Sequence, residues 1–269
     1  MRHDCGYVFN KKIFKNEVGY VIADKRRCEN EGQGYNVWVS GYTKNLKHVV
    51  IQDSIEGHDI FSIGYDAFKD CQSLKSAIIP ENIKAIQIRA FENCSNLESV
   101  HTFGNILELT SCVFKNCTNL KHIVFETKLI FISNNVFEGC TSLEKIIFPF
   151  EVAHINSYAF KNCDNLKKII FKSKIAPEIN KNTFSYIPDD CIIYVPRNSK
   201  GYKNYKWWGL NIKYTPIIIN PFAGGLSLTD NSIGNLSVCN DTGNLSLSKD
   251  RPKRNIFNFF SKFIEELNK

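Results

Sequence analysis

The chain has 269 residues, of which 43% are hydrophobic and 23% charged, and it carries a formal net charge of +7. A chain of this length and composition folds as one large domain or two small ones with a substantial core. The modest charge, with lysines mixed among Asp and Glu, argues against nucleic-acid binding, and the lack of any stretch near about 18 uninterrupted apolar residues argues against a transmembrane helix.

The first 45 residues predict a β-rich N-terminal cap. Residues 17–25 (EVGYVIADK) and 35–42 (YNVWVSGY) have the composition of strands and flank the segment ENEGQG, so we expect a hairpin. The terminal coil of a repeat protein needs a distinct outer face, which residues 1–45 would supply. The following segment NLKHVVI repeats half of the motif found downstream, and we interpret it as a first, irregular rung.

Most of the chain is an internal repeat with a period of 23 residues. Three residue types mark it: Phe68, Phe91, Phe114, Phe137, Phe160 and Phe184; Cys71, Cys94, Cys117, Cys140 and Cys163; Leu74, Leu97, Leu120, Leu143 and Leu166. Residues that recur once per period occupy the same place in successive coils, and stacked coils share one core. The segment L-x-x-I-x-F predicts a short parallel strand, upstream pairs such as Ile83 and Ile86 predict a second one, and the A-F-x-x-C corner predicts a tight helical or irregular turn.

The unit I-x-x-I-x-x-x-A-F-x-x-C-x-x-L-x-x-I-x-F resembles the BspA-like (Treponema pallidum-type) leucine-rich repeats, over about Leu46 to Thr215. The segment CIIYVPRNSKGYKNYKWWGLNIKY is similar to the C-terminal ending of that family, in which a Tyr/Trp-bearing segment closes the core. The resemblance implies a mainly β fold: a right-handed leucine-rich-repeat solenoid of 23-residue repeats with short parallel strands over residues 46–215. It also implies a recognition surface, often used for adhesion or host contact in surface-exposed members, and carries over no catalytic residue.

Two further segments follow the repeats. Residues 216–250 are rich in Gly, Asn and Ser and contain GLSL, GNLSV and GNLSL, which is typical of a flexible linker; three short β-forming contacts for a partner or sister chain are the alternative. Residues 251–269 predict a basic, amphipathic C-terminal helix. That helix is compatible with packing on the solenoid or pairing with another helix, with docking in a partner groove, or with contact to an anionic membrane surface, which is not favoured.

The regularly spaced cysteines are interpreted as core residues. No C-x-x-C pair occurs, and five equivalent cysteines argue against any one of them being a catalytic nucleophile. A free cysteine behaves as a small, readily buried hydrophobe. His101 and His122 lie on adjacent rungs without a convincing third metal ligand, and no phosphate-binding or hydrolase motif is present. We therefore expect no cofactor, no metal and no enzymatic activity.

The strand motif predicts which side chains face solvent. In L-x-x-I-x-F the first, fourth and sixth residues point inward, so the third and fifth point outward. The candidate partner-binding residues selected in this way are Ile78, His101, His122, Val124, Lys145, Ile147, Lys168 and Ile170. An exposed aliphatic row beside polar and basic side chains is typical of a protein-binding face, although β-branched residues also favour strands when solvated.

The sequence therefore predicts a non-enzymatic recognition protein that binds another macromolecule, expected to be a protein, through the strand face of the solenoid. One alternative is an adaptor or scaffold that acts through residues 216–269, and another is a cell-surface adhesin exported without a recognisable signal peptide. The N-terminus lacks the apolar core of a signal peptide, and the core is rich in thiols, so a cytoplasmic location is favoured. The cell surface is the alternative that the family resemblance implies.

Overall fold

The structure is a computed structural model that describes residues 7–25, 35–42, 45–103, 105–126, 128–204, 207 and 209–215. Throughout this part of the chain the regular elements are β-strands, and it contains no helix able to cross a membrane. The linker and helix predicted for residues 216–250 and 251–269 lie outside the described residues.

Antiparallel strands form the N-terminal end of the fold. β1 (Tyr7–Lys15) and β2 (Val18–Lys25) are joined by Asn16 and Glu17, whose φ angles of 49° and 65° suit a two-residue hairpin turn. β2 pairs antiparallel with β3 (Tyr35–Tyr42), which confirms the predicted hairpin.

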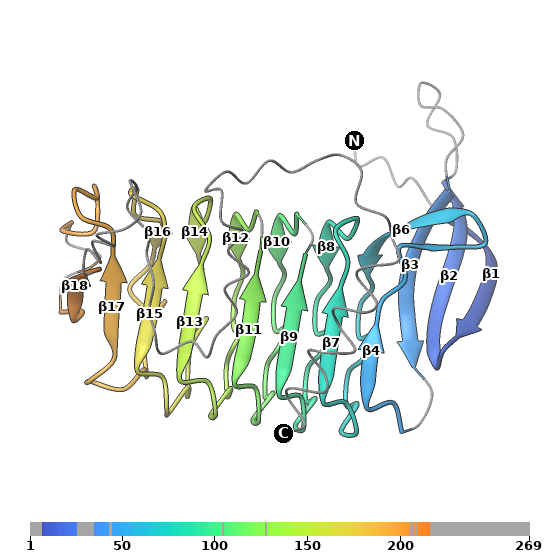
Figure 1. Ribbon diagram of the computed structural model, residues 1–269, viewed down its shortest axis with the longest axis horizontal. Helices are drawn as coiled ribbons and strands as arrows, with labels where there is room; N and C mark the ends of the chain where they lie inside the picture. The colour runs from blue at the N-terminus through green and yellow to red at the C-terminus, as the bar shows by residue number, and fades with distance from the viewer. Residues whose placement is uncertain are drawn as a thin grey trace, which may run out of the picture. The chain divides into compact units, whose positions relative to one another are not determined.

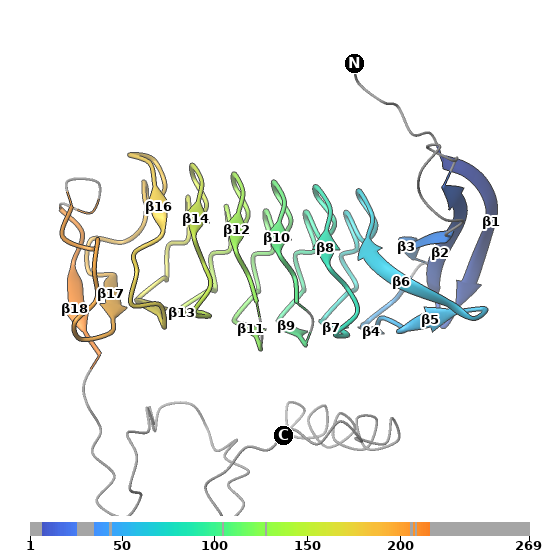
Figure 2. The ribbon, with the colours of Figure 1, turned by 90° about the horizontal axis from the view of Figure 1, so that it is seen from above.

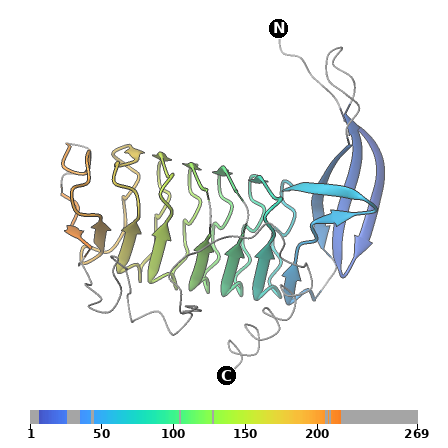
Figure 3. The same cartoon turned by 45° about the horizontal axis from the view of Figure 1, so that its top comes forward.

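The N-terminal sheet continues directly into the repeats. β3 pairs in parallel with β6 (His58–Ile63), which pairs in turn with the short strand β8 (Ala85–Ile86). β5 (Ser54–Ile55) adds an antiparallel pairing to β6. Figure 1 and Figure 3 show this passage from the antiparallel strands, in blue, to the parallel rungs.

Each turn of the repeat contributes a longer and a shorter parallel strand. The longer strands are β4 (His48–Val50), β7 (Ser76–Ile79), β9 (Ser99–Thr102), β11 (His122–Phe125), β13 (Lys145–Phe148), β15 (Lys168–Phe171), β17 (Ile192–Val195) and β18 (Ile212–Tyr214). The shorter ones are β8, β10 (Glu108–Leu109), β12 (Phe131–Ile132), β14 (His154–Ile155) and β16 (Glu178–Ile179).

The two sets of strands lie on opposite sides of the solenoid, as the view from above shows (Figure 2). Residues 23 apart pair in register, for example Lys145 with Lys168 and Ile132 with Ile155. We call the outward surface of the longer strands the long-strand face and that of the shorter strands the short-strand face. The predicted mainly β solenoid of 23-residue repeats is confirmed.

The sheet of longer strands is divided in the middle. β4, β7, β9 and β11 form one sheet and β13, β15, β17 and β18 another, with no strand pairing between β11 and β13. At the position after the strand, the amide N–H of Glu126 donates to the carbonyl of Thr102, and that of Lys172 donates to Phe148. Pro149 occupies the equivalent position after β13 and has no N–H to donate to β11. The missing donor is one physical cause of the break.

The core is built around a column of stacked phenylalanines. Phe68, Phe91, Phe114, Phe137, Phe160 and Phe184 are all buried, and consecutive ring centroids lie 5.0, 5.4, 5.7, 5.6 and 5.7 Å apart. The rings are within 16° of parallel, an arrangement in which offset aromatic rings attract. The column ends on other aromatic residues: Tyr42 stacks on Phe68 at 6.1 Å, and Trp207 packs on Phe184 at 5.6 Å.

Trp207 closes the C-terminal end of the core. Its side chain is 1% exposed and also meets Phe171 edge-on at 5.8 Å and Tyr202 at 4.9 Å. Tyr202 is itself held by a hydrogen bond from its hydroxyl to the carbonyl oxygen of Ser173, at 3.1 Å. The closing role that the family resemblance implied for this Tyr/Trp segment agrees with these contacts.

The A-F-x-x-C corners are irregular turns rather than helices. Each corner contains two residues with positive φ, for example Asn135 and Gly139 at 60° and 75°. The second of these positions is Asp70, Asn93, Asn116, Gly139 or Asn162, residue types that tolerate the left-handed region. At Gly139 a Cβ atom would lie 2.5 Å from Oδ1 of Asn116, so any other residue at this position would displace the Asn116 side chain.

Replacing Phe137 with alanine is expected to lower the free energy of unfolding by about 3–5 kcal/mol, the typical cost of removing a fully buried aromatic side chain. Phe150→Ala is the control, because Phe150 is 65% exposed and its removal should cost less than about 0.5 kcal/mol. Urea-induced unfolding followed by circular dichroism measures both costs. Equal costs would contradict a core built on this column.

Candidate functional site

The repeating cysteines form a second buried column beside the phenylalanines. Cys71, Cys94, Cys117, Cys140 and Cys163 are at most 1% exposed, and the cysteines within the described residues are free thiols. The thiol of Cys94 donates to the carbonyl oxygen of Phe68 at 3.0 Å, and that of Cys163 to Phe137 at 3.0 Å. Cys117 and Cys140 make the same bond at 3.1 and 3.2 Å. Each thiol therefore fills volume, as predicted, and also ties its rung to the preceding one, which the sequence analysis missed.

The environment of these thiols suppresses their reactivity. Burial raises the pKa of Cys163 to about 12 and that of Cys191 to about 11. The pKa values of Cys117 and Cys140 are raised well above the ordinary value by the same cause. The thiolate is the nucleophile and the metal ligand, so a thiol that stays protonated serves neither role. Within the described residues, no group of three or more His, Cys, Asp or Glu side chains is arranged to hold a metal ion.

The long-strand face carries most of the residues predicted to face outward. Val124 is 42% exposed and His122 is exposed. The remaining predicted residues, Ile78 apart, are half-buried on the same face: His101, Lys145, Ile147, Lys168 and Ile170. Val124 on β11 and Ile147 on β13 lie on either side of the break between the two sheets.

The prediction that Ile78 faces solvent is wrong. Its side chain is only 6% exposed. Ile78 pairs in register with Val50 on β4 and with His101 on β9. Val50 itself is 36% exposed and belongs to this row. The sequence contained the signal, since NLKHVVI carries Val50 at the fifth position of the strand motif.

His101 is tied into the surface rather than free. Its Nε2 lies 2.9 Å from Oε1 of Glu126, and its ring stacks on Phe103 at a centroid distance of 4.2 Å. The hydrogen bond from His101 lowers the pKa of the Glu126 carboxyl. His122 on the next strand pairs in register with Ser99 and is therefore diagonal to His101, and among the described residues no third metal ligand joins the two histidines.

The turn corner shows how charged residues are stacked without repulsion. Lys69, Glu92, Lys115, Glu138 and Lys161 follow one another at intervals of 23 residues and alternate in sign; we call them the charge ladder. Lys69 pairs with Glu92 at 3.0 Å, Lys115 with Glu138 at 2.9 Å and Lys161 with Glu138 at 3.4 Å. This alternation was not predicted, although it is visible in the sequence at the repeat period.

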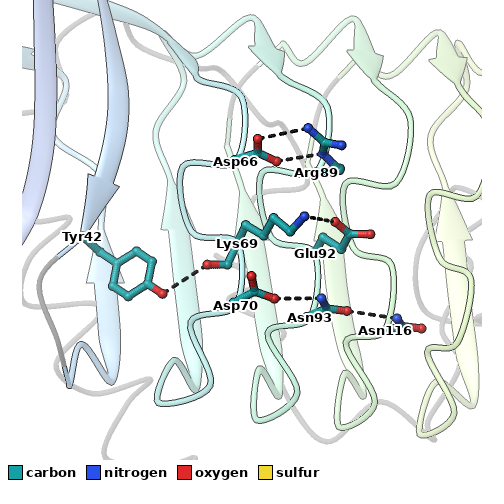
Figure 4. Close-up of polar contacts among 8 residues, drawn as sticks. All are labelled: Tyr42, Asp66, Lys69, Asp70, Arg89, Glu92, Asn93 and Asn116. Atoms are coloured by element: carbon teal, nitrogen blue, oxygen red, sulfur yellow. Dashed lines mark hydrogen bonds and ion pairs between the residues drawn. The ribbon is translucent and has the colours of Figure 1, made fainter.

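Other cross-rung polar contacts surround the charge ladder (Figure 4). Arg89 donates to both carboxylate oxygens of Asp66, at 2.8 and 3.1 Å. Asn93 donates to Asp70 at 2.7 Å, and Asn116 donates to Asn93 at 2.9 Å. The polar groups of this corner are thus used in holding rungs together.

Comparison with known proteins supports the same architecture. The family model described as "BspA type Leucine rich repeat region" matches residues 61–189 in six copies. The crystal structure of the T. pallidum leucine-rich repeat protein is 25% identical and superposes with a TM-score of 0.52, covering 60% of this chain and 71% of its own. A leucine-rich cell surface protein from Faecalibacterium prausnitzii has 17% identity and a TM-score of 0.57 over 76% of this chain and 55% of its own, a likeness of fold. No curated protein sequence matches the chain.

The thiol of Cys140 should resist alkylation by iodoacetamide in the native protein and react once the protein is unfolded in denaturant, because it is fully buried and its pKa is raised. Cys112, which is half-buried at the corner surface, is the internal comparison and should react first. Mass spectrometry of peptides after timed labelling measures both. Rapid native labelling of Cys140 would contradict a sealed column.

Glu138 should make stability depend on pH. Burial alone raises the pKa of this carboxyl, but hydrogen bonds from Lys115, Asn135 and Lys161 outweigh burial and hold the pKa below its ordinary value. Its stabilising effect is therefore present above the unfolded-state pKa of about 4.5 and is lost as the pH falls through the lower folded-state pKa.

Glu138→Gln should accordingly cost about 1.5–3 kcal/mol at pH 7, the range for hydrogen bonds to charged groups, and much less near pH 3. Urea-induced unfolding of both proteins at the two pH values measures this difference. A cost that stays constant with pH would show that the charge of Glu138 has no role. Glu144→Gln is the control, since Glu144 is exposed and reaches Lys167 only at 3.8 Å.

Proposed function

Because the repeats over residues 61–189 belong to the BspA-type leucine-rich repeat family, we propose that this chain is a non-enzymatic recognition protein that binds another protein through its long-strand face. The solenoid presents a row of side chains on each strand, held at a fixed spacing by the stacked core. The family is one in which such surfaces commonly serve protein interaction or surface adhesion.

One observation carries the proposal: inward and outward positions differ in how much they vary from rung to rung. The inward columns repeat Phe, Cys and Leu in five consecutive turns. The outward third position reads Ser76, Ser99, His122, Lys145 and Lys168, and the fifth reads Ile78, His101, Val124, Ile147 and Ile170. A position that the fold leaves free to change can be adapted to a partner, and the long-strand face has two such positions on each strand.

The thiols support this proposal over a catalytic one. The regularly spaced cysteines are buried and their pKa values are raised where a shift is resolved, so none of them supports covalent catalysis. An adaptor role for residues 216–269 stays a prediction, because that segment lies outside the described residues.

The cell surface becomes the better-supported location for this activity. Free thiols indicate a cytoplasmic location because exposed thiols are oxidised outside the cell. The thiols of the core are buried and protonated, so they are protected from oxidation in either compartment and do not favour the cytoplasm. The F. prausnitzii protein with the same fold is described as a cell surface protein. A surface location of this chain is therefore part of the proposal.

Replacing Val124 with the photo-crosslinker p-benzoylphenylalanine should yield a discrete cross-linked adduct with a partner protein, identified by mass spectrometry. The same substitution at Ile88 is the matched control, since Ile88 is also partly exposed, at 36%, but lies after the short strand β8. Both variants should also be tested without residues 216–269. Adducts that form equally from both positions, or that disappear with the tail, would contradict a partner site on the long-strand face.

A further inference from the structure

The charged side chains of the longer strands are all basic. The described strands β4, β7, β9, β11, β13, β15, β17 and β18 contain no Asp or Glu. They carry Lys145, Lys168 and Lys213. The short-strand face differs, because Glu108 and Glu178 lie on β10 and β16.

Two of these lysines are placed against each other. Lys145 on β13 pairs in register with Lys168 on β15, and neighbouring strands are only about 4.7–4.9 Å apart. Like charges directly opposite each other on adjacent strands are destabilising. Both lysines are half-buried, and within the described residues neither makes an ion pair. The charge ladder at the corner avoids this repulsion by alternation, whereas the long-strand face tolerates it.

His122 extends the cluster to β11. Burial lowers the pKa of its imidazole, and the charges of Lys121 and Lys145 lower it further. Two carboxylates, Glu144 and Glu98, oppose this effect, and Glu144 also faces Lys167 at 3.8 Å. At neutral pH the positive charge of this row therefore comes from Lys145 and Lys168, whereas the neutral His122 imidazole offers a ring N–H as a hydrogen-bond donor.

A parallel aliphatic row runs beside this one. Val124, Ile147 and Ile170 lie two residues further along the same three strands, and so on the same outward face. An α-helix laid across the rungs would repeat every 5.4 Å, close to the strand spacing of about 4.7–4.9 Å. Between the paired strands β13 and β15 one helical turn differs from the strand spacing by less than about 1 Å, so side chains one turn apart can meet both strands.

We propose that the long-strand face over β11, β13 and β15 binds an acidic, amphipathic α-helix of a partner protein. Carboxylates spaced one turn apart contact His122, Lys145 and Lys168, and an adjacent aliphatic stripe packs on Val124, Ile147 and Ile170. This inference rests on the proposed function and names the chemistry of its partner. The unpaired lysines and the matching helical repeat carry it.

The probe is a fluorescent helical peptide with Glu at positions i, i+4 and i+7, which span about two helical turns, and Leu on the neighbouring stripe. Its control is the same peptide with Lys in place of Glu. Anisotropy titration with the full chain should show binding of the acidic peptide only, weakening as salt increases. Lys145→Gln/Lys168→Gln should weaken binding about five- to thirtyfold, as expected for the loss of two partly exposed charge pairs.

A matched double variant tests whether binding depends on this lysine cluster or only on the net charge of the protein. Lys84→Gln/Lys181→Gln removes the same charge from exposed lysines outside the long-strand face and should leave binding unchanged. Urea-induced unfolding should show Lys145→Gln/Lys168→Gln to be at least as stable as the unaltered chain, because a repulsion is removed. Weakened binding therefore cannot be attributed to misfolding.

Three results of the binding titrations would overturn the inference. The acidic and basic peptides could bind equally, the two double variants could lose affinity equally, or a sulfated glycan could bind with the expected lysine dependence while the acidic peptide does not. A partner cross-linked from Val124 that binds independently of salt and of Lys145 and Lys168 would overturn this inference while leaving the proposed function intact. If no cross-link forms from Val124 either, both this inference and the proposed function are contradicted.

Discussion

Every turn of this solenoid buries its apolar side chains against the equivalent side chains of the next turn, about one strand spacing away. A single 23-residue turn cannot bury them alone, so each position must tolerate a copy of itself as its neighbour. The buried columns meet this requirement with groups that attract their own kind or the backbone of the adjacent rung. Phenylalanine rings stack at 5.0–5.7 Å, and each thiol from Cys94 to Cys163 donates to a phenylalanine carbonyl of the preceding rung.

Charged residues are subject to the same requirement, but a charged side chain repels an identical side chain on the next turn. At the corner the sequence alternates Lys and Glu from Lys69 to Lys161, so that neighbours attract. On the long-strand face Lys145 is followed by Lys168, and neither is compensated within the described residues. The repulsion between like charges is thus avoided at the corner but remains between Lys145 and Lys168 on the long-strand face. This contrast is the physical reason for assigning the partner to that face.

The period alone made much of this architecture predictable, because a residue repeated every 23 positions defines a column and strand alternation gives its direction. The burial of the cysteines and the exposure of Val124 followed from that geometry. The thiol hydrogen bonds did not, since they depend on the corner backbone, and neither did the burial of Ile78 between Val50 and His101. The break between β11 and β13 involves the missing N–H of Pro149, whose effect appears only once the rungs are stacked. The alternation of Lys and Glu in the charge ladder is visible in the sequence. That it forms ion pairs follows only once these residues are known to be neighbours on successive turns.

The most direct test of this account is to delete one complete period. Removing residues 115–137 joins Phe114 to Glu138 and returns every later residue to its own column, whereas removing residues 118–137 leaves the later rungs three residues out of register. Urea-induced unfolding followed by circular dichroism compares the two shortened chains. The account predicts that the 23-residue deletion retains the β spectrum and unfolds cooperatively, and that the 20-residue deletion does not. Equally stable folded proteins from both deletions would contradict the claim that stacking of equivalent residues determines the fold.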